Sequence, residues 1–257
     1  YIGVLSDKKV FFIILTKSFA NMGKNELIQY TIIIIITCNL LGFFFSVISI
    51  HFSFLNKFKI QKRKIKPITF YKRIPLILFN IILLIIISFL GLYFFYDFGF
   101  FQEGEILSYN SDFILIFAQL FLILVIDDLY FYFLHSFMHK NKYVLKKIHN
   151  IHHRAISPVA LEYIYVHPFE WMMGYIGPFL GILVISFFGP VSFFSFWLYQ
   201  IIRNLHELDV HSGFKSKFSK WIPFWGETEH HDKHHESLNG NYATTFTFWD
   251  EIFGTKI

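Results

Sequence analysis

The residues best suited to chemistry are histidines, of which the chain has thirteen, and most of them lie in three short motifs. The first motif separates two histidines by three residues, and the other two contain three histidines with the spacing i, i+3, i+4. On a helix this spacing places the imidazoles on one face, where they can reach a common point. The motifs contain His135 and His139; His149, His152 and His153; and His231, His234 and His235.

These motifs indicate metal binding, because neutral imidazole is the commonest metal ligand among protein side chains. All-nitrogen sites suit iron, zinc, copper or nickel rather than magnesium or calcium, and so many imidazoles can surround more than one ion. Cys38 is the only cysteine, which excludes a zinc site built from cysteines. A bis-histidine haem is a weaker alternative, since it would place isolated histidines opposite each other within the membrane.

Several other histidines are candidates for the same site. His211 follows the last apolar region, and His206 lies five residues before His211. His167, which stands before a proline, and His230, which opens the third motif, are further candidate ligands. His51 stands alone at the end of an apolar run, and we interpret it as structural.

Acidic side chains near the histidines are candidates for orienting them. Asp127 and Asp128 interrupt an apolar run two helical turns before His135. Charged groups are costly inside a membrane segment and are therefore functional candidates. Together with Glu162 and Glu170, these acids are predicted to hold ligand histidines through hydrogen bonds.

The composition predicts a membrane protein. Hydrophobic residues make up 54% of the chain and charged residues 16%, and the mean hydropathy is +0.48. A bilayer crossing needs about 20 apolar residues. Long apolar runs cover 27–54, 74–98, 113–134 and 171–202. The last run is broken by Gly189-Pro190, which predicts a helical hairpin, with one long kinked helix as the alternative.

A basic loop orients these segments. Residues 57–73 join the first two spans and contain eight lysines and arginines, which places the loop on the cytoplasmic side. A hairpin at 171–202 brings all the histidine motifs to the side of this loop, whereas a single helix would separate them. Residues 1–26 are too short an apolar stretch to span, and predict an interfacial helix or a loose N-terminus.

The three histidine motifs, in this order, resemble the signature of the membrane-bound fatty acid hydroxylase and sterol desaturase superfamily. Within it, the chain is most similar to sterol C-4 methyl oxidases. Four intervening stretches are also similar to the pattern of these enzymes, at 162–170, 208–214, 222–235 and 241–255. The resemblance runs from about Ile123 to the C-terminus, whereas residues 1–110 match only in being hydrophobic.

The resemblance implies an all-α fold, with about four transmembrane helices and a His-rich helical cap that holds a dinuclear metal site. It divides the chain into an N-terminal membrane region, 1–110, and a hydroxylase-like domain, 111–257. The implied ligands are His135, His139, His149, His152, His153, His211, His231, His234 and His235. Three positions depart from the sterol oxidase pattern: His206, Ser136 in place of a frequent arginine, and Leu129 in place of a common tryptophan.

The resemblance also implies a reaction. Two iron ions, with zinc as an alternative occupant of the isolated protein, and O₂ would oxidise a sterol or another lipid, most simply at the C-4 methyl group of a sterol. The chain has no dinucleotide fingerprint, so electrons from NAD(P)H would arrive through a separate cytochrome b5-type donor and reductase. The sequence does not identify the catalytic side chains beyond the metal centre.

Other expectations concern the surroundings of the protein. We expect membrane lipids and a lipid substrate as partners, and no nucleic acid. The endoplasmic reticulum is the usual location of the family, with the mitochondrial inner membrane as an alternative. The alternative function is a non-catalytic accessory subunit of a larger membrane complex, for example a respiratory one, that retains the hydroxylase fold.

Overall fold

The computed structural model describes residues 23–61, 63–101 and 110–257. Within these residues the chain is helical and contains no β-strand, so the predicted all-α class is confirmed. The prediction for residues 1–26 falls almost entirely outside the described residues.

Four helical segments are long and apolar enough to cross a membrane, as predicted. The first three lie in α2 (Lys24–His51), α3 (Pro67–Asp97) and α4 (Asn110–Lys140), and the fourth, Pro168–Ser186, comprises α7 (Pro168–Gly174) and α8 (Ile176–Ser186). Many large apolar side chains on these helices are exposed, for example Phe44, Leu78 and Phe94. In water such a surface would be unfavourable, so these side chains face lipid.

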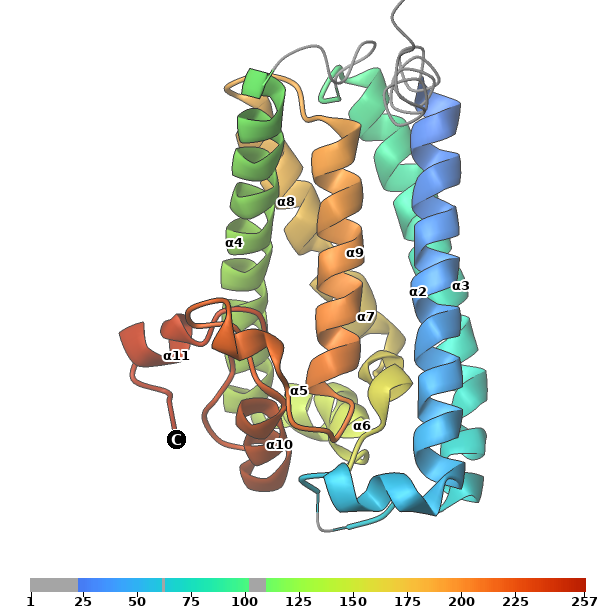
Figure 1. Ribbon diagram of the computed structural model, residues 1–257. Helices are drawn as coiled ribbons and strands as arrows, with labels where there is room; N and C mark the ends of the chain where they lie inside the picture. Colours follow the sequence, from blue (N-terminus) through green and yellow to red (C-terminus); the bar gives the residue numbers. More distant parts are fainter. Residues whose placement is uncertain (1–22, 62, 102–109) are drawn as a thin grey trace, which may run out of the picture.

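The predicted hairpin is confirmed and the single kinked helix is wrong. In Figure 1, α8 leads away from the end of the bundle that holds α10, and α9 (Phe193–Val210) returns to it. The turn contains Gly189, whose φ of +151° suits glycine, followed by Pro190. Gln119 of α4 holds the turn, because its Nε2 donates to the Pro190 carbonyl at 3.0 Å and its Oε1 accepts from the Ser192 amide at 2.9 Å.

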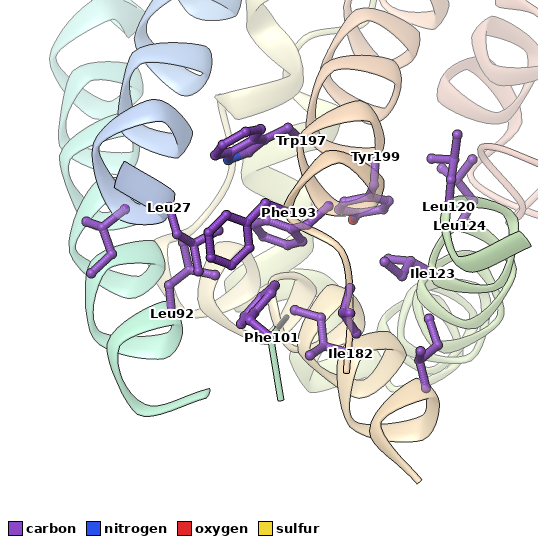
Figure 2. Close-up of a cluster of buried hydrophobic side chains, with 14 of the residues drawn as sticks. Leu27, Leu92, Phe101, Leu120, Ile123, Leu124, Ile182, Phe193, Trp197 and Tyr199 are labelled. Atoms are coloured by element: carbon purple, nitrogen blue, oxygen red, sulfur yellow. The ribbon is translucent and has the colours of Figure 1, made fainter. Parts of the chain in front are cut away.

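The main apolar core lies in the part of the bundle where α2 and α9 begin. Aromatic side chains of α9 interlock there with aliphatic ones from α2, α3, α4 and α8 (Figure 2). Phe193 and Phe196 pack edge to face against Phe101, which anchors the chain after α3. Between membrane-spanning helices such packing is favoured by van der Waals contacts rather than by the hydrophobic effect. This core fixes α9, and with it the residues at the other end of α9.

The histidine-rich cap lies at the opposite end of the bundle, on the same side as the basic loop (Figure 1). It contains α5 (Lys142–Val144), a π-helical turn at Leu145–His149, α6 (Asn150–His153), a 3₁₀ turn at Ala160–Ile164, α10 (Thr228–Ser237) and α11 (Phe248–Ile252). A 3₁₀ helix at Ser53–Phe58 begins the basic loop, and another short one covers Phe218–Lys220. The placement agrees with the predicted topology.

The basic loop is tied directly to the cap. The Ile60 amide donates at 2.9 Å to the carbonyl of Gly213, which lies two residues after His211. Gln61 Nε2 donates to Asp232 Oδ1 in α10 at 2.8 Å. These bonds fasten the loop to two segments that carry histidines of the candidate site.

Candidate metal centre

Nine buried histidines form two clusters, in each of which the candidate ligand nitrogens lie within 4.8 Å of one another. Cluster A consists of His135, His139, His149, His153 and His234, and cluster B of His152, His211, His231 and His235. The clusters adjoin, since the ring centroids of His153 and His235 are only 4.8 Å apart. The structure therefore brings together the nine histidines that the family resemblance implies as ligands.

Each three-histidine motif serves both clusters. In the second motif His149 and His153 belong to cluster A and His152 to cluster B. In the third motif the assignment is reversed, because His231 and His235 belong to cluster B and His234 to cluster A. On a helix, residues i and i+4 are about 40° apart around the axis, whereas i+3 lies about 60° to the other side. The i, i+4 pair therefore shares one cluster, and the i+3 imidazole points to the neighbouring one.

The spacing of the ring nitrogens fits metal ions. In cluster A the Nε2 atoms of His139, His149 and His153 are 2.9, 3.0 and 3.1 Å apart. In cluster B, His231 Nε2 lies 2.9 Å from His211 Nε2 and 3.1 Å from His235 Nε2. Two nitrogens that bind one ion at about 2.1 Å, at a right angle, are about 3.0 Å apart. The clusters thus present nitrogens at the separation that adjacent ligands require.

Two histidines of cluster A point a nitrogen without a hydrogen-bond partner into the cluster. His135 Nδ1 donates to the Tyr242 carbonyl at 2.7 Å, and His234 Nδ1 donates to the Gly240 carbonyl at 2.8 Å. Their Nε2 atoms are buried and unpaired. A carbonyl that accepts from Nδ1 leaves Nε2 as the unprotonated, metal-binding nitrogen. The donor set therefore fits a transition metal.

Carboxylates and carbonyls orient further histidines. His149 Nδ1 lies 2.8 Å from Glu170 Oε1, and His211 Nδ1 lies 2.9 Å from the Glu207 carbonyl and 3.5 Å from Glu207 Oε2. A carboxylate behind an imidazole fixes its orientation and raises its basicity. Glu207 was not identified from the sequence, although its position one helical turn before His211 was an available signal.

The environment of the cap favours the neutral form of several of its imidazoles. Burial, partly opposed by Glu170, lowers the pKa of His152 to about 4. Burial and neighbouring imidazoles also lower the pKa values of His153, His231, His234 and His235. Neutral imidazole is the form that binds metals, so these side chains are ready for an ion at neutral pH.

Acid is expected to destabilise the metal-free protein. The pKa of His152 is about 6.5 in the unfolded chain but about 4 in the folded state. Between these values the unfolded state binds more protons, so stability decreases as the pH falls through this range. Burial raises the pKa values of Asp232, Asp209 and Glu162, which acts in the opposite direction, but the histidines with lowered pKa values are more numerous. Thermal unfolding of chelator-treated protein between about pH 7 and pH 5 measures the effect, and a constant melting temperature would contradict it.

Three candidate histidines lie outside both clusters. His206 Nε2 donates to the Thr244 carbonyl at 2.9 Å, and its ring packs against Trp225. His230 Nε2 lies 3.2 Å from Asp250 Oδ2. His167 caps α7, where its Nδ1 accepts from the Phe169 amide at 3.1 Å. The structure gives these three side chains structural contacts and does not bring them to the ligand groups.

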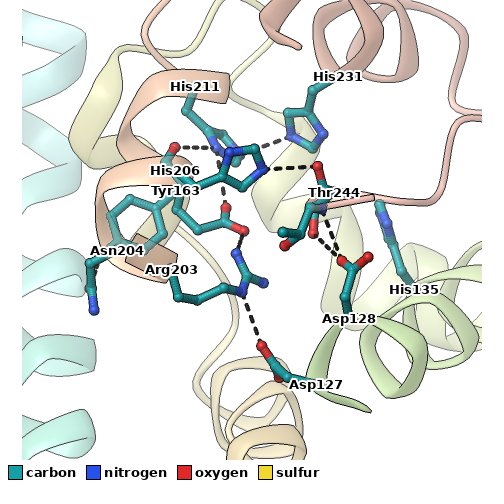
Figure 3. Close-up of polar contacts among 12 residues, drawn as sticks. Asp127, Asp128, His135, Tyr163, Arg203, Asn204, His206, His211, His231 and Thr244 are labelled. Atoms are coloured by element: carbon teal, nitrogen blue, oxygen red, sulfur yellow. Dashed lines mark hydrogen bonds and ion pairs between the residues drawn. The ribbon is translucent and has the colours of Figure 1, made fainter. Parts of the chain in front are cut away.

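The candidate acids have different partners from those expected (Figure 3). Asp127 Oδ2 accepts from Arg203 at 3.1 Å and from Tyr199 at 2.8 Å. Asp128 accepts from the amides of Thr245 and Phe246 at 2.9 and 2.8 Å. Neither carboxylate contacts a cluster histidine. Asp128 instead holds the segment that follows Tyr242, whose carbonyl accepts from His135.

Glu162 also lies away from the clusters. Its Oε1 accepts from Arg73 Nη1 at 2.6 Å, and its Oε2 accepts from the Val159 amide at 3.1 Å. It therefore ties α3 to the 3₁₀ turn at Ala160–Ile164. Of the two candidate glutamates, Glu170 is the one that contacts a cluster histidine.

A pocket leads from the clusters into the bundle. His135 and His149 of cluster A and His152, His211 and His231 of cluster B contribute to its wall. Apolar and aromatic side chains of α3, α4, α7 and α8 continue the wall among the membrane-spanning helices; they include Leu84, Phe131, Trp171, Tyr175 and Pro178. An apolar molecule from the bilayer would thus meet both clusters at one end of the pocket.

This geometry defines a class of protein: an integral membrane protein with two histidine clusters, each of which could hold a metal ion, beside a largely apolar pocket. A sequence model of the fatty acid hydroxylase family matches residues 120–255. Methylsterol monooxygenase 1 of Rattus norvegicus is 35% identical over 221 residues, which cover 84% of this chain and 71% of that protein. The chain therefore belongs to the fatty acid hydroxylase family, whose members are oxidoreductases.

Other relatives are similar over different lengths. Methylsterol monooxygenase 1 of Danio rerio is 33% identical over 235 residues, which cover 90% of this chain and 76% of that protein. A very-long-chain aldehyde decarbonylase of Oryza sativa subsp. indica is 34% identical over 146 residues, which cover 54% of this chain and 52% of that protein. No solved structure matches the chain significantly. The family resemblance inferred from the histidine motifs is thus confirmed.

Proposed function

We propose that the protein is an iron-dependent monooxygenase that oxidises the C-4 methyl group of a sterol. The single observation that carries this proposal is the pair of adjoining histidine clusters at the end of an apolar pocket. The nine histidines are proposed as the ligands of two iron ions. Two relatives that align with more than four fifths of this chain are methylsterol monooxygenases, which favours a methylsterol over other lipids.

The bound irons would supply the O₂-dependent oxidation of an unactivated C–H bond, which no amino-acid side chain achieves. The side chains of the protein bind the sterol and position the histidines that would hold the irons. The carbonyls of Tyr242 and Gly240 fix the tautomers of two imidazoles, and Glu170 orients a third. Aromatic and aliphatic side chains such as Trp171 and Leu84 bury the hydrocarbon skeleton and exclude water from the reacting carbon.

Electrons are proposed to come from NAD(P)H through a cytochrome b5-type donor at the endoplasmic reticulum membrane. The cap end of the molecule has exposed basic side chains, which suit an acidic protein surface. On the basic loop they include Lys57, Arg63, Lys64 and Lys66, and beyond α9 they include Lys215 and Lys220. The loop is fastened to α10 by the bond from Gln61 to Asp232, so a donor docked there would lie next to the metal-binding helices.

Neutralising the basic loop is expected to slow electron delivery. Replacing Lys57, Arg63, Lys64 and Lys66 by glutamine removes the charges that would steer an acidic donor, and the rate should fall on the order of tenfold at low salt. Stopped-flow reduction by the donor protein measures the rate. Turnover driven by a small chemical reductant is the control and should be unchanged. Equal rates with the donor protein would exclude the loop as its docking site.

The proposed activity is tested with the full chain purified in lipid nanodiscs. About two irons per chain and O₂-dependent oxidation of a 4-methylsterol, followed by mass spectrometry, are expected. Acyl-chain substrates are the comparison, because the family also includes an aldehyde decarbonylase relative. Full iron loading with no oxidation of any lipid would favour the accessory-subunit alternative, which has no support among the relatives described above.

A further inference from the structure

Glu170 presents an unpaired oxygen inside the candidate pocket. The residue lies in α7 and is 6% exposed, and it contributes to the pocket wall. Its Oε1 lies 2.8 Å from His149 Nδ1, whereas its Oε2 is buried without a hydrogen-bond partner. Leaving a buried acceptor unsatisfied is unfavourable, so such an atom in a binding pocket indicates a donor on the ligand.

The other two carboxylates of this pocket share one cation. Arg203 forms an ion pair with Asp127 (Figure 3) and a second one with Glu207. Among the described residues that line the pocket, Glu170 is the carboxylate that has no lysine or arginine at ion-pair distance. Its free oxygen is therefore the strongest available acceptor for a neutral donor such as an alcohol.

We propose that Glu170 Oε2 accepts the hydrogen bond of the substrate alcohol, which in a 4-methylsterol is the hydroxyl group on C3. This inference rests on the proposed function. The hydroxyl oxygen and the C-4 methyl carbon are separated by only three bonds, so an acceptor for the hydroxyl must lie next to the metal centre. Glu170 meets this requirement, because its second oxygen contacts a histidine of cluster A.

This contact would give the enzyme a specificity. An alcohol donates a hydrogen bond to a carboxylate, whereas a ketone at C3 presents only lone pairs to it and is repelled. Glu170 would thus select 3-hydroxysterols over 3-ketosterols. Because the same carboxylate orients His149, the position of the sterol would be set relative to a metal ligand through one side chain.

The test compares a 4-methylsterol with its 3-ketone in the wild-type protein, Glu170→Gln and Glu207→Gln. The wild type should prefer the alcohol in kcat/KM by about tenfold to a hundredfold, the usual effect of a hydrogen bond to a charged group. In Glu170→Gln the amide oxygen can still accept from His149, while its NH₂ group can donate to the ketone. The preference should therefore disappear or reverse.

Glu207→Gln is the matched control, because Glu207 also lies in the pocket and contacts a histidine, but both of its oxygens have partners. This variant can lose turnover, yet it should retain the preference for the alcohol. Glu170→Asp is a second variant, which keeps the charge but shortens its reach, and it should lose part of the preference.

Equilibrium binding of both sterols to iron-free protein in nanodiscs gives a readout that does not depend on turnover. The same ratio of dissociation constants should be seen, and it should collapse in Glu170→Gln. An unchanged ratio in folded Glu170→Gln and Glu170→Asp would overturn the role of Glu170 while leaving the sterol oxidase proposal intact. A wild type that neither binds nor oxidises the 4-methylsterol would instead refute the proposed function.

Discussion

Replacing His234 by alanine is expected to abolish turnover and to lower the iron content, mainly at cluster A. His234 is fully buried, its Nδ1 is held by the Gly240 carbonyl, and its Nε2 is directed without a partner into cluster A. Loss of an outer hydrogen-bond partner of a metal ligand costs about 10- to 100-fold in metal affinity or activity. Loss of the ligand itself should exceed this range.

The variant His235→Ala tests cluster B independently of cluster A. His235 belongs to cluster B, so this substitution should lower the iron content mainly at the other site. Iron per chain by elemental analysis and the rate of sterol oxidation are the measurements. His51→Ala is the control, since this exposed histidine contacts Tyr71 and lies outside both clusters. Full iron and activity in His234→Ala would disprove the assignment of cluster A as a metal site.

Replacing Asp128 by alanine is expected to lower both the stability of the protein and its affinity for iron, an effect second in size to that of His234→Ala. Its 1% exposed side chain accepts from two backbone amides, those of Thr245 and Phe246, and both would be left buried and unpaired. Each such group costs about 1–3 kcal/mol. Shortly before them in the chain, Tyr242 holds His135 through its carbonyl, so displacement of this segment should also weaken iron binding by about 10- to 100-fold.

Thermal unfolding and competition with an iron chelator measure the two effects of Asp128→Ala. The matched variant Asp128→Asn keeps one acceptor oxygen and should fall between the alanine variant and the wild type. Asp97→Ala is a surface control, because its ion pair with Lys24 is exposed and such pairs contribute little. If Asp128→Ala bound iron as tightly as the wild type, the link from Asp128 through Tyr242 to His135 would be wrong.

Local patterns in the sequence were sufficient to predict the arrangement of the membrane-spanning helices. The lengths of the apolar runs predicted the four spanning segments, because the thickness of a bilayer sets the number of residues. Gly189-Pro190 predicted the hairpin, because one residue occupies an unusual φ and the other cannot continue a helix. The side on which the histidines lie followed from the hairpin and the basic loop.

The partners of the candidate acids were not predictable in the same way. Glu162 and Glu170 lie in the same motif, yet Glu162 pairs with Arg73 and only Glu170 reaches a cluster histidine. Which carboxylate meets an imidazole depends on how α3 and α7 pack against the cap. His206 was a candidate because it lies five residues before His211, but its ring instead donates to the Thr244 carbonyl.

By itself, the sequence determined that the chain crosses a membrane, that its histidines lie in helical motifs suited to metal binding, and which family it belongs to. These properties depend on composition and on spacings of a few residues. Only the tertiary structure decided how the motifs divide between two clusters, with His152 and His153 adjacent in the chain but in different ones. Helical geometry separates such neighbours by about 100° around the axis, and the packing of helices distant in sequence determines what each imidazole meets.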